Sequence, residues 1–136
     1  MLRIAIAIFF MLHGLVHLLY AGHSAGMFEL SSGLTWPDGS WAFSRLLGNG
    51  ATRGLAASLA VLAAVIFVVG GGALLFKQAW WRAAILGAAA FSGVVYLLLW
   101  DGGLARLDDK GGVGLLINLA ILVALLAFQW PSFAEV

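Results

Sequence analysis

Two histidines, His13 and His17, stand four positions apart in an apolar stretch near the start of the chain. In a helix this spacing puts both rings on one face, where they could ligate a metal together or bind one polar group. A haem held by both rings is excluded, because two rings on one face cannot approach an iron from opposite sides. A haem held by one histidine, or by one from each subunit of a homodimer, stays open. The metal alternative lacks a third ligand within the bilayer, since Asp101 and His23 are expected at its surface.

Polar side chains in the other apolar stretches fall at a depth similar to that of the histidines. At a rise of about 1.5 Å per residue, one side chain from each stretch lies roughly 6–8 Å below the same membrane face. These four are His17, Ser58, Tyr96 and Asn118. By the same rule His13 lies deeper, at about 13 Å, close to the level of Ser92.

This polar layer has two interpretations. In the first, which we favour, it is a hydrogen-bonded layer that fixes helix rotation: His17 bonds Asn118, Ser58 bonds a carbonyl of its own helix, and Tyr96 reaches the headgroups. In the second, His17, Ser58, Tyr96 and Asn118, with His13 beneath, line a pocket open to the long-loop side. Such a pocket would bind a quinone ring, a lipid headgroup or an ion, with Asp101 and the pair Asp108–Asp109 at its rim.

The composition places these residues in a membrane. Of 136 residues, 63% are hydrophobic and only 10% are charged, and the mean hydropathy is +1.06. Soluble domains are about half apolar and a quarter charged. A formal net charge of +1 gives no basic surface for nucleic acid. The absence of cysteine excludes thiolate catalysis and iron–sulfur ligation. No complete catalytic set is recognisable, which favours a protein that is not an enzyme.

Four stretches are long and apolar enough to cross a bilayer, which takes about 20 residues. They are Leu2–Gly22, Gly54–Phe76, Trp80–Trp100 and Val113–Trp130. The sequence therefore predicts an all-α transmembrane four-helix bundle, a single domain over 1–136. The tryptophans support this division, because Trp36, Trp41 and Trp100 fall at one membrane face and Trp80, Trp81 and Trp130 at the other. A cleaved signal peptide ending near Ala21 or Ala25 is the alternative for the first stretch.

Small residues predict how the helices pack. The second and third stretches each carry a stripe of small side chains, so we expect an antiparallel pair that packs along them. The stripes are Ala56, Ala60 and Ala64 in one helix, and Ala84, Ala88 and Ser92 in the other. The cluster Gly70–Gly72 predicts a kink or a close approach. In the long connection, Trp41–Leu47 predicts two helical turns lying flat at the interface, with Asn49–Gly50 as their stop.

An even number of crossings places both termini on one side. That face carries Arg3, Lys77 and Arg82, whereas the basic residues of the opposite face are diluted by acidic ones. A compact basic turn opposite an acid-rich loop favours termini in the cytoplasm.

The segment His13–Gly14–Leu15–Val16–His17–Leu18–Leu19 resembles the first helix of the DoxX-like families of small four-helix bacterial membrane proteins. That helix carries a His–Gly–x–x–Lys–Leu–Phe type of pattern near its end. His13, Gly14 and the position of His17 carry the resemblance, and His17 replaces the lysine. It implies a bacterial inner-membrane helix bundle, tied in some members to quinone-linked or oxidative-stress systems.

Together these observations predict a non-catalytic accessory or scaffold protein of the bacterial inner membrane. We expect it to form a homo-oligomer or to join a larger membrane complex, with the lipid bilayer as its surroundings. The first alternative is binding of a quinone or lipid headgroup between the helices. The second is binding of a metal or haem through His13 and His17. No cofactor is required by the sequence.

Overall fold

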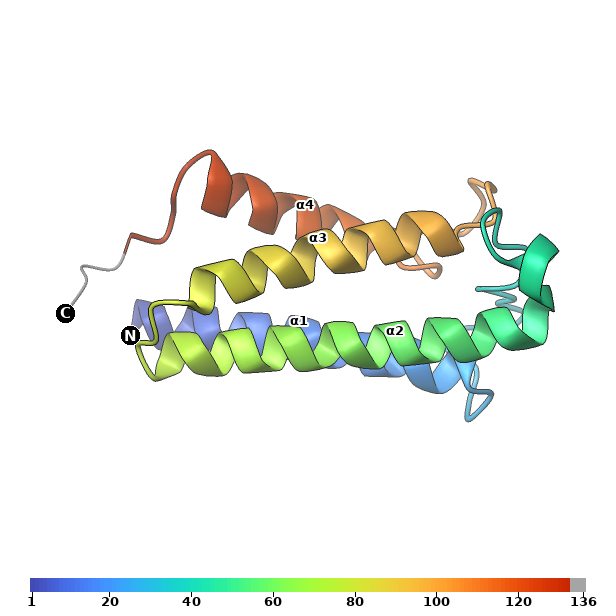
Figure 1. Ribbon diagram of the computed structural model, residues 1–136, viewed down its shortest axis with the longest axis horizontal. Coiled ribbons are helices and arrows are strands. Elements are labelled where there is room, and N and C mark those ends of the chain that lie inside the picture. The colour runs from blue at the N-terminus through green and yellow to red at the C-terminus, as the bar shows by residue number, and fades with distance from the viewer. Residues whose placement is uncertain (133–136) are drawn as a thin grey trace.

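The computed structural model describes residues 1–132, and this part of the chain is all-helical. Residues 133–136, the end of the single predicted domain, lie outside the described residues. The four helices run up and down along one long axis (Figure 1). They are α1 (Leu2–Ser24), α2 (Ser44–Leu75), α3 (Trp81–Leu99) and α4 (Gly112–Leu126). The predicted all-α four-helix bundle is confirmed, and α1, α2 and α3 are long and apolar enough to cross a membrane.

The fourth helix is shorter than predicted. Its 15 residues end at Leu126 instead of Trp130, so it is about 22 Å long, less than the roughly 30 Å of a bilayer core. Pro131 disfavours helical backbone at the residue before it. The Arg82 guanidinium of α3 then satisfies carbonyl groups at this end of the chain, donating to the oxygens of Leu125, Gln129 and Pro131 at 2.9, 3.1 and 3.0 Å.

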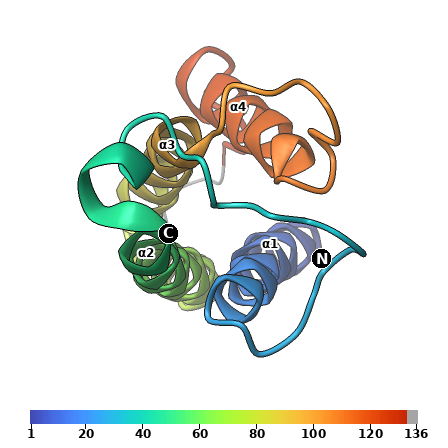
Figure 2. The ribbon, with the colours of Figure 1, turned by 90° about the vertical axis from the view of Figure 1, so that its right-hand side faces the viewer.

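The second helix is broken near its start. Gly48 has a φ of 77° and a ψ of 163°, a conformation that glycine adopts without the penalty of a Cβ. The short first turn, Ser44–Leu47, therefore points away from the axis of the rest of the helix (Figure 2). The predicted helical stop at Asn49–Gly50 is wrong, because both residues belong to the long helix after the break.

Glycines allow α1 and α2 to pack closely. A Cβ added at Gly14 would lie 2.6 Å from the Phe67 Cβ, and one added at Gly71 would lie 2.9 Å from the Ala7 carbonyl oxygen. The neighbouring Gly70 faces α3, where an added Cβ would lie 2.8 Å from the Ile85 Cδ1. The glycine cluster thus provides close approach on two sides, while the helix continues through it.

The alanine stripes are buried, but they do not face only each other. Ala56, Ala60 and Ala64 are all buried, yet the Ala64 carbonyl oxygen lies 3.1 Å from the Cβ position of Gly14 in α1. A stripe of every fourth residue drifts by about 40° per step, since each residue turns about 100°. It therefore moves from the α3 side of α2 towards the α1 side. On α3, Ala88 and Ser92 are buried and Ala84 is partly exposed.

The connections at the α1 C-terminal end are tied together by polar contacts. Arg106 pairs with Asp109 at 2.8 Å, and it also donates to the Ser32 carbonyl oxygen at 3.0 Å. Ser31 donates to the same Asp109 carboxylate at 3.1 Å. The long connection is therefore fastened to the α3–α4 connection across the end of the bundle.

Candidate functional site

Four polar side chains from three helices form one hydrogen-bonded network in the interior, which we call the histidine network. His13 Nε2 lies 2.8 Å from Asn118 Oδ1, and Asn118 Nδ2 donates to Ser92 Oγ at 2.9 Å. His17 Nε2 lies 2.6 Å from the same Ser92 oxygen, and His17 Nδ1 lies 3.0 Å from the His13 carbonyl oxygen. The network thus joins α1, α3 and α4.

The backbone carbonyl group of His13 fixes the direction of every hydrogen bond in this network. Since a carbonyl oxygen only accepts, His17 Nδ1 carries the proton that it donates to His13. In a neutral ring, His17 Nε2 is then an acceptor, and the Ser92 hydroxyl donates a hydrogen bond to it. Ser92 Oγ accepts from Asn118 Nδ2, and Asn118 Oδ1 accepts from His13 Nε2–H. All four bonds are satisfied with both rings neutral, the state that burial in a membrane favours.

Phe67 of α2 packs against both histidine rings. Its ring lies edge-on to His13 with 4.8 Å between centroids and tilted against His17 at 5.5 Å. The two imidazoles lie at 87° to one another. Phe67 and Asn118 are almost fully buried, with exposed fractions of 0% and 2%. The Gly14 contact with α2 brings α1 close enough for this packing.

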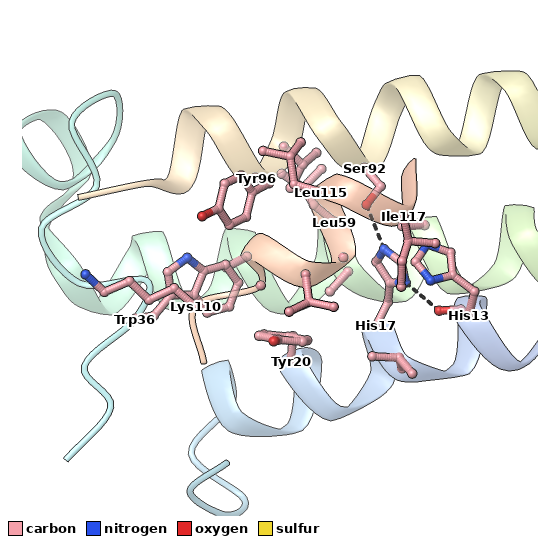
Figure 3. Close-up of a pocket in the computed structure, with 18 residues that line it drawn as sticks. His13, His17, Tyr20, Trp36, Leu59, Ser92, Tyr96, Lys110, Leu115 and Ile117 are labelled. Carbon is pink, nitrogen blue, oxygen red and sulfur yellow. Dashed lines mark hydrogen bonds between the residues drawn. The ribbon is translucent and has the colours of Figure 1, made fainter. Parts of the chain in front are cut away.

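The structure rearranges the predicted polar layer. His17 bonds Ser92, and Asn118 bonds His13 in place of His17. Ser58 is exposed on the outer face of α2 and donates to the Gly54 carbonyl oxygen at 3.0 Å. The expectation that Ser58 faces the other members is therefore wrong, whereas its bond to its own helix is confirmed. The predicted depths were also inexact, because Asn118, placed level with His17, bonds His13, and Ser92, placed level with His13, bonds His17. Tyr96, expected in the same layer as His17, lies at the other end of the cavity described next (Figure 3).

A cavity of about 280 Å³ extends from the histidine network towards the long connection (Figure 3). Its deep end is formed by His13, His17 and Ser92, and its other end by Trp36, Tyr96 and Lys110. Between them the wall is apolar, with Val16, Leu59, Ala60, Ala63, Val95 and Ile117 among the lining side chains. An apolar cavity of about 150 Å³ suffices for benzene, so a substituted six-membered ring fits here.

The loop-side end of the cavity, as we call the end at Trp36, Tyr96 and Lys110, was predicted only in part: Tyr96 was expected to line a pocket, whereas Trp36 and Lys110 were not. Trp36 was expected in an interfacial belt, but it is only 7% exposed and its ring lies edge-on to Tyr20 at 5.5 Å. His23 Nε2, 3.0 Å from the Trp36 carbonyl oxygen, holds this segment against the end of α1. The signal in the sequence was His23 itself, a histidine in the last turn of a helix that precedes a long connection.

An ion pair stands beside the loop-side end. Lys110 Nζ lies 2.7 Å from Asp101 Oδ2, and the lysine side chain is only 10% exposed. Burial raises the pKa of Asp101, but hydrogen bonds from Lys110 and from the Gly103 N–H, with the lysine charge, outweigh it and hold this pKa below its ordinary value. Asp101 was expected at the rim of a pocket, and it lies there as the partner of a lining residue.

We predict an acid-dependent loss of stability from this pair. Because the pKa of Asp101 is lowered on folding, its contribution is fully present above the ordinary value of 3.8 and is lost as the pH falls through the folded-state value. An Asp101→Asn variant has no carboxylate to protonate, so it cannot lose stability in this way. Thermal unfolding in detergent between about pH 6 and pH 3 should therefore show wild-type stability falling towards that of the variant. Parallel curves for the two proteins throughout this range would contradict the prediction.

Within residues 1–132, no group of three histidine, cysteine or carboxylate side chains is placed to hold a metal ion. The Nε2 atoms of His13 and His17, the candidate ligands, are turned to Asn118 and Ser92. The geometry therefore favours hydrogen bonding over metal ligation at these histidines.

Comparisons with protein-family models, curated proteins and solved structures give no match to this chain.

Proposed function

We propose that this protein binds a small lipophilic molecule, such as a quinone or the head of a neutral lipid, in the cavity between its helices. The observation that carries the proposal is the cavity itself, about 280 Å³ with an apolar wall and polar groups at both ends. Binding sites of this kind are largely apolar, with a few polar groups that orient the ligand. Three of the helices around the cavity are long and apolar enough to cross a bilayer, so molecules dissolved in lipid would surround the bundle.

The position of the polar groups supports this proposal over a purely structural layer. The histidine network alone would fix helix rotation without any open volume beside it. Here it forms the deep end of a cavity whose side walls are mostly alanine and branched aliphatic side chains. Small residues at Ala56, Ala60 and Ala63 keep the volume open where larger ones would fill it. The structure thus leaves unfilled space at the centre of an otherwise packed bundle.

Filling the cavity tests the proposal. Ala60→Leu replaces a methyl group in the cavity wall with an isobutyl group, and we expect the variant to lose the molecule that wild type retains. Ala57→Leu is the matched control, one turn away on α2 and outside the cavity wall. The measurement is mass spectrometry of organic extracts from protein purified out of native membranes. Wild-type protein that carries no bound molecule, or an Ala60→Leu extract equal to that of Ala57→Leu, would count against binding.

The accessory or scaffold role remains a second proposal. The shortness of α4 favours it, because about 22 Å of helix does not reach across a bilayer core and a neighbouring subunit would complete the crossing. The resemblance to DoxX-like proteins supports a bacterial inner-membrane location. We propose that both termini face the cytoplasm, on the side of the basic turn between α2 and α3.

A further inference from the structure

The indole nitrogen of Trp36 is a buried donor with no acceptor among the described residues. Trp36 lines the cavity at its loop-side end, and its indole N–H can only donate a hydrogen bond. Buried polar groups in folded proteins are nearly always paired, so each exception calls for an explanation. A ligand that accepts a hydrogen bond at this point would provide the missing partner.

A second donor stands at the same end of the cavity. The Tyr96 hydroxyl makes no hydrogen bond to any residue of the described chain, although the ring itself packs at 3.4 Å from the Cβ position of Gly111. In Figure 3 the Trp36 nitrogen and the Tyr96 hydroxyl point towards one another from opposite walls. Two donors from the long connection and from α3 thus converge on one region of the cavity.

The hydrogen-bond donors at the deep end of the cavity already have partners. The side-chain bonds of the histidine network are made to one another and to the His13 backbone. In this arrangement both ring N–H groups and the Ser92 hydroxyl proton are already donated within the network, so a carbonyl oxygen that bonded to any of them would have to break one of these bonds. The donors that are free to bind a carbonyl oxygen therefore lie at the loop-side end.

We propose that the loop-side end binds the carbonyl oxygen of an uncharged lipophilic molecule, with Trp36 Nε1 and the Tyr96 hydroxyl as donors. This inference rests on the proposed function and names the chemical group that the site recognises. The apolar body of the ligand then extends along Ala60 and Ala63 towards the histidine network.

The charges at this end favour a neutral acceptor over an anion. Lys110 is the cation in the cavity wall, and its ammonium already pairs with Asp101 at 2.7 Å. An anionic group drawn to Lys110 would meet the Asp101 carboxylate on the same side. The indole and phenol donors carry no charge. A ring ketone or a lipid ester provides the matching group, a neutral carbonyl oxygen on an apolar molecule.

Direct binding of defined probes separates these possibilities. The full chain in detergent micelles is titrated calorimetrically with 2,6-dimethyl-1,4-benzoquinone, with monoolein as a neutral ester, and with p-xylene as a ring without a carbonyl. We expect one carbonyl probe to bind more tightly than p-xylene. Tyr96→Phe and Trp36→Phe should each weaken that probe roughly three- to tenfold, the effect of losing one hydrogen bond. Trp41→Phe, a tryptophan of the same connection outside the cavity wall, should leave affinity unchanged.

The outcomes distinguish this inference from the proposed function. A p-xylene affinity equal to that of the carbonyl probes, or unchanged affinity in both Tyr96→Phe and Trp36→Phe, overturns the carbonyl site even if Ala60→Leu loses its bound molecule. The same holds if neither carbonyl probe binds wild type. If Trp36→Phe does not fold, Tyr96→Phe alone decides, because that hydroxyl has no partner in residues 1–132 to lose. Binding of the quinone alone or of monoolein alone identifies the source of the carbonyl.

Discussion

Replacing Asn118 with leucine should destabilise the protein by about 1–3 kcal/mol, the cost of leaving buried polar groups without partners. Leucine has a similar size but cannot accept from His13 Nε2 or donate to Ser92, the two bonds that Asn118 makes. Asn118 is only 2% exposed, so water cannot replace it. Single hydrogen bonds within membranes contribute on average about 0.6 kcal/mol. We expect more here because one side chain holds two partners.

Ser58→Leu provides the control for this prediction. Ser58 is exposed and bonds only the Gly54 carbonyl oxygen of its own helix, so its replacement should change stability by less than about 0.5 kcal/mol. The measurement is unfolding by heat or by a denaturing detergent in mixed micelles. An Asn118→Leu protein as stable as Ser58→Leu would mean that the network contributes little to folding.

Gly14→Ala should also destabilise the protein by about 1–3 kcal/mol, because it forces apart two helices that are already in contact. The added Cβ would lie 2.6 Å from the Phe67 Cβ and 3.1 Å from the Ala64 carbonyl oxygen. Neither atom is the free end of a flexible side chain, so α1 and α2 must separate. Since Phe67 packs on both histidine rings, the separation should also loosen the histidine network.

A neighbouring pair of glycines provides a matched comparison for this packing effect. Gly71→Ala would meet the Ala7 carbonyl oxygen at 2.9 Å, whereas Gly72→Ala meets no atom within 4 Å. Both substitutions gain the same helix propensity, at most about 1 kcal/mol. We therefore expect Gly71→Ala to unfold at lower temperature than wild type and Gly72→Ala at the same or higher temperature. Equal unfolding temperatures for the two variants would show that the contact between α1 and α2 accommodates an added methyl group.

Hydropathy and counted depth predicted much of this architecture, but they could not predict the rotation of each helix about its axis. Spacing alone placed His13 and His17 on one face. Counting residues placed Asn118 level with His17 and Ser92 level with His13, but the bonds join the opposite pairs. Ser58 satisfied the same depth rule and yet faces outward. The rotation of α2 is set by contacts such as that between Gly71 and α1, and these contacts are known only once both helices are placed together.

Trp36, at the loop-side end of the cavity, was missed for a different reason. An aromatic residue beside a membrane span is ordinarily assigned to the interface, and Trp36 follows a helix that ends near the bilayer surface. Its burial depends on His23, which bonds the Trp36 backbone across a separation of 13 residues. The position of His23 in the last turn of α1 is a signal, but it does not identify the residue of the long connection that His23 contacts. The end of α4 was overestimated because apolar residues continue after the helix stops at Leu126.

The bend at Gly48 has a consequence for the depth of the protein in a bilayer. Beyond it, Leu46 and Leu47 are 82% and 51% exposed, and Trp41 nearby is 60% exposed. The segment that carries these side chains crosses the end of the bundle. Apolar side chains on such a segment are stable among acyl chains just below the headgroups. We expect these side chains to anchor the segment at the membrane interface, which would fix the depth of the bundle in the bilayer and with it the depth of the cavity.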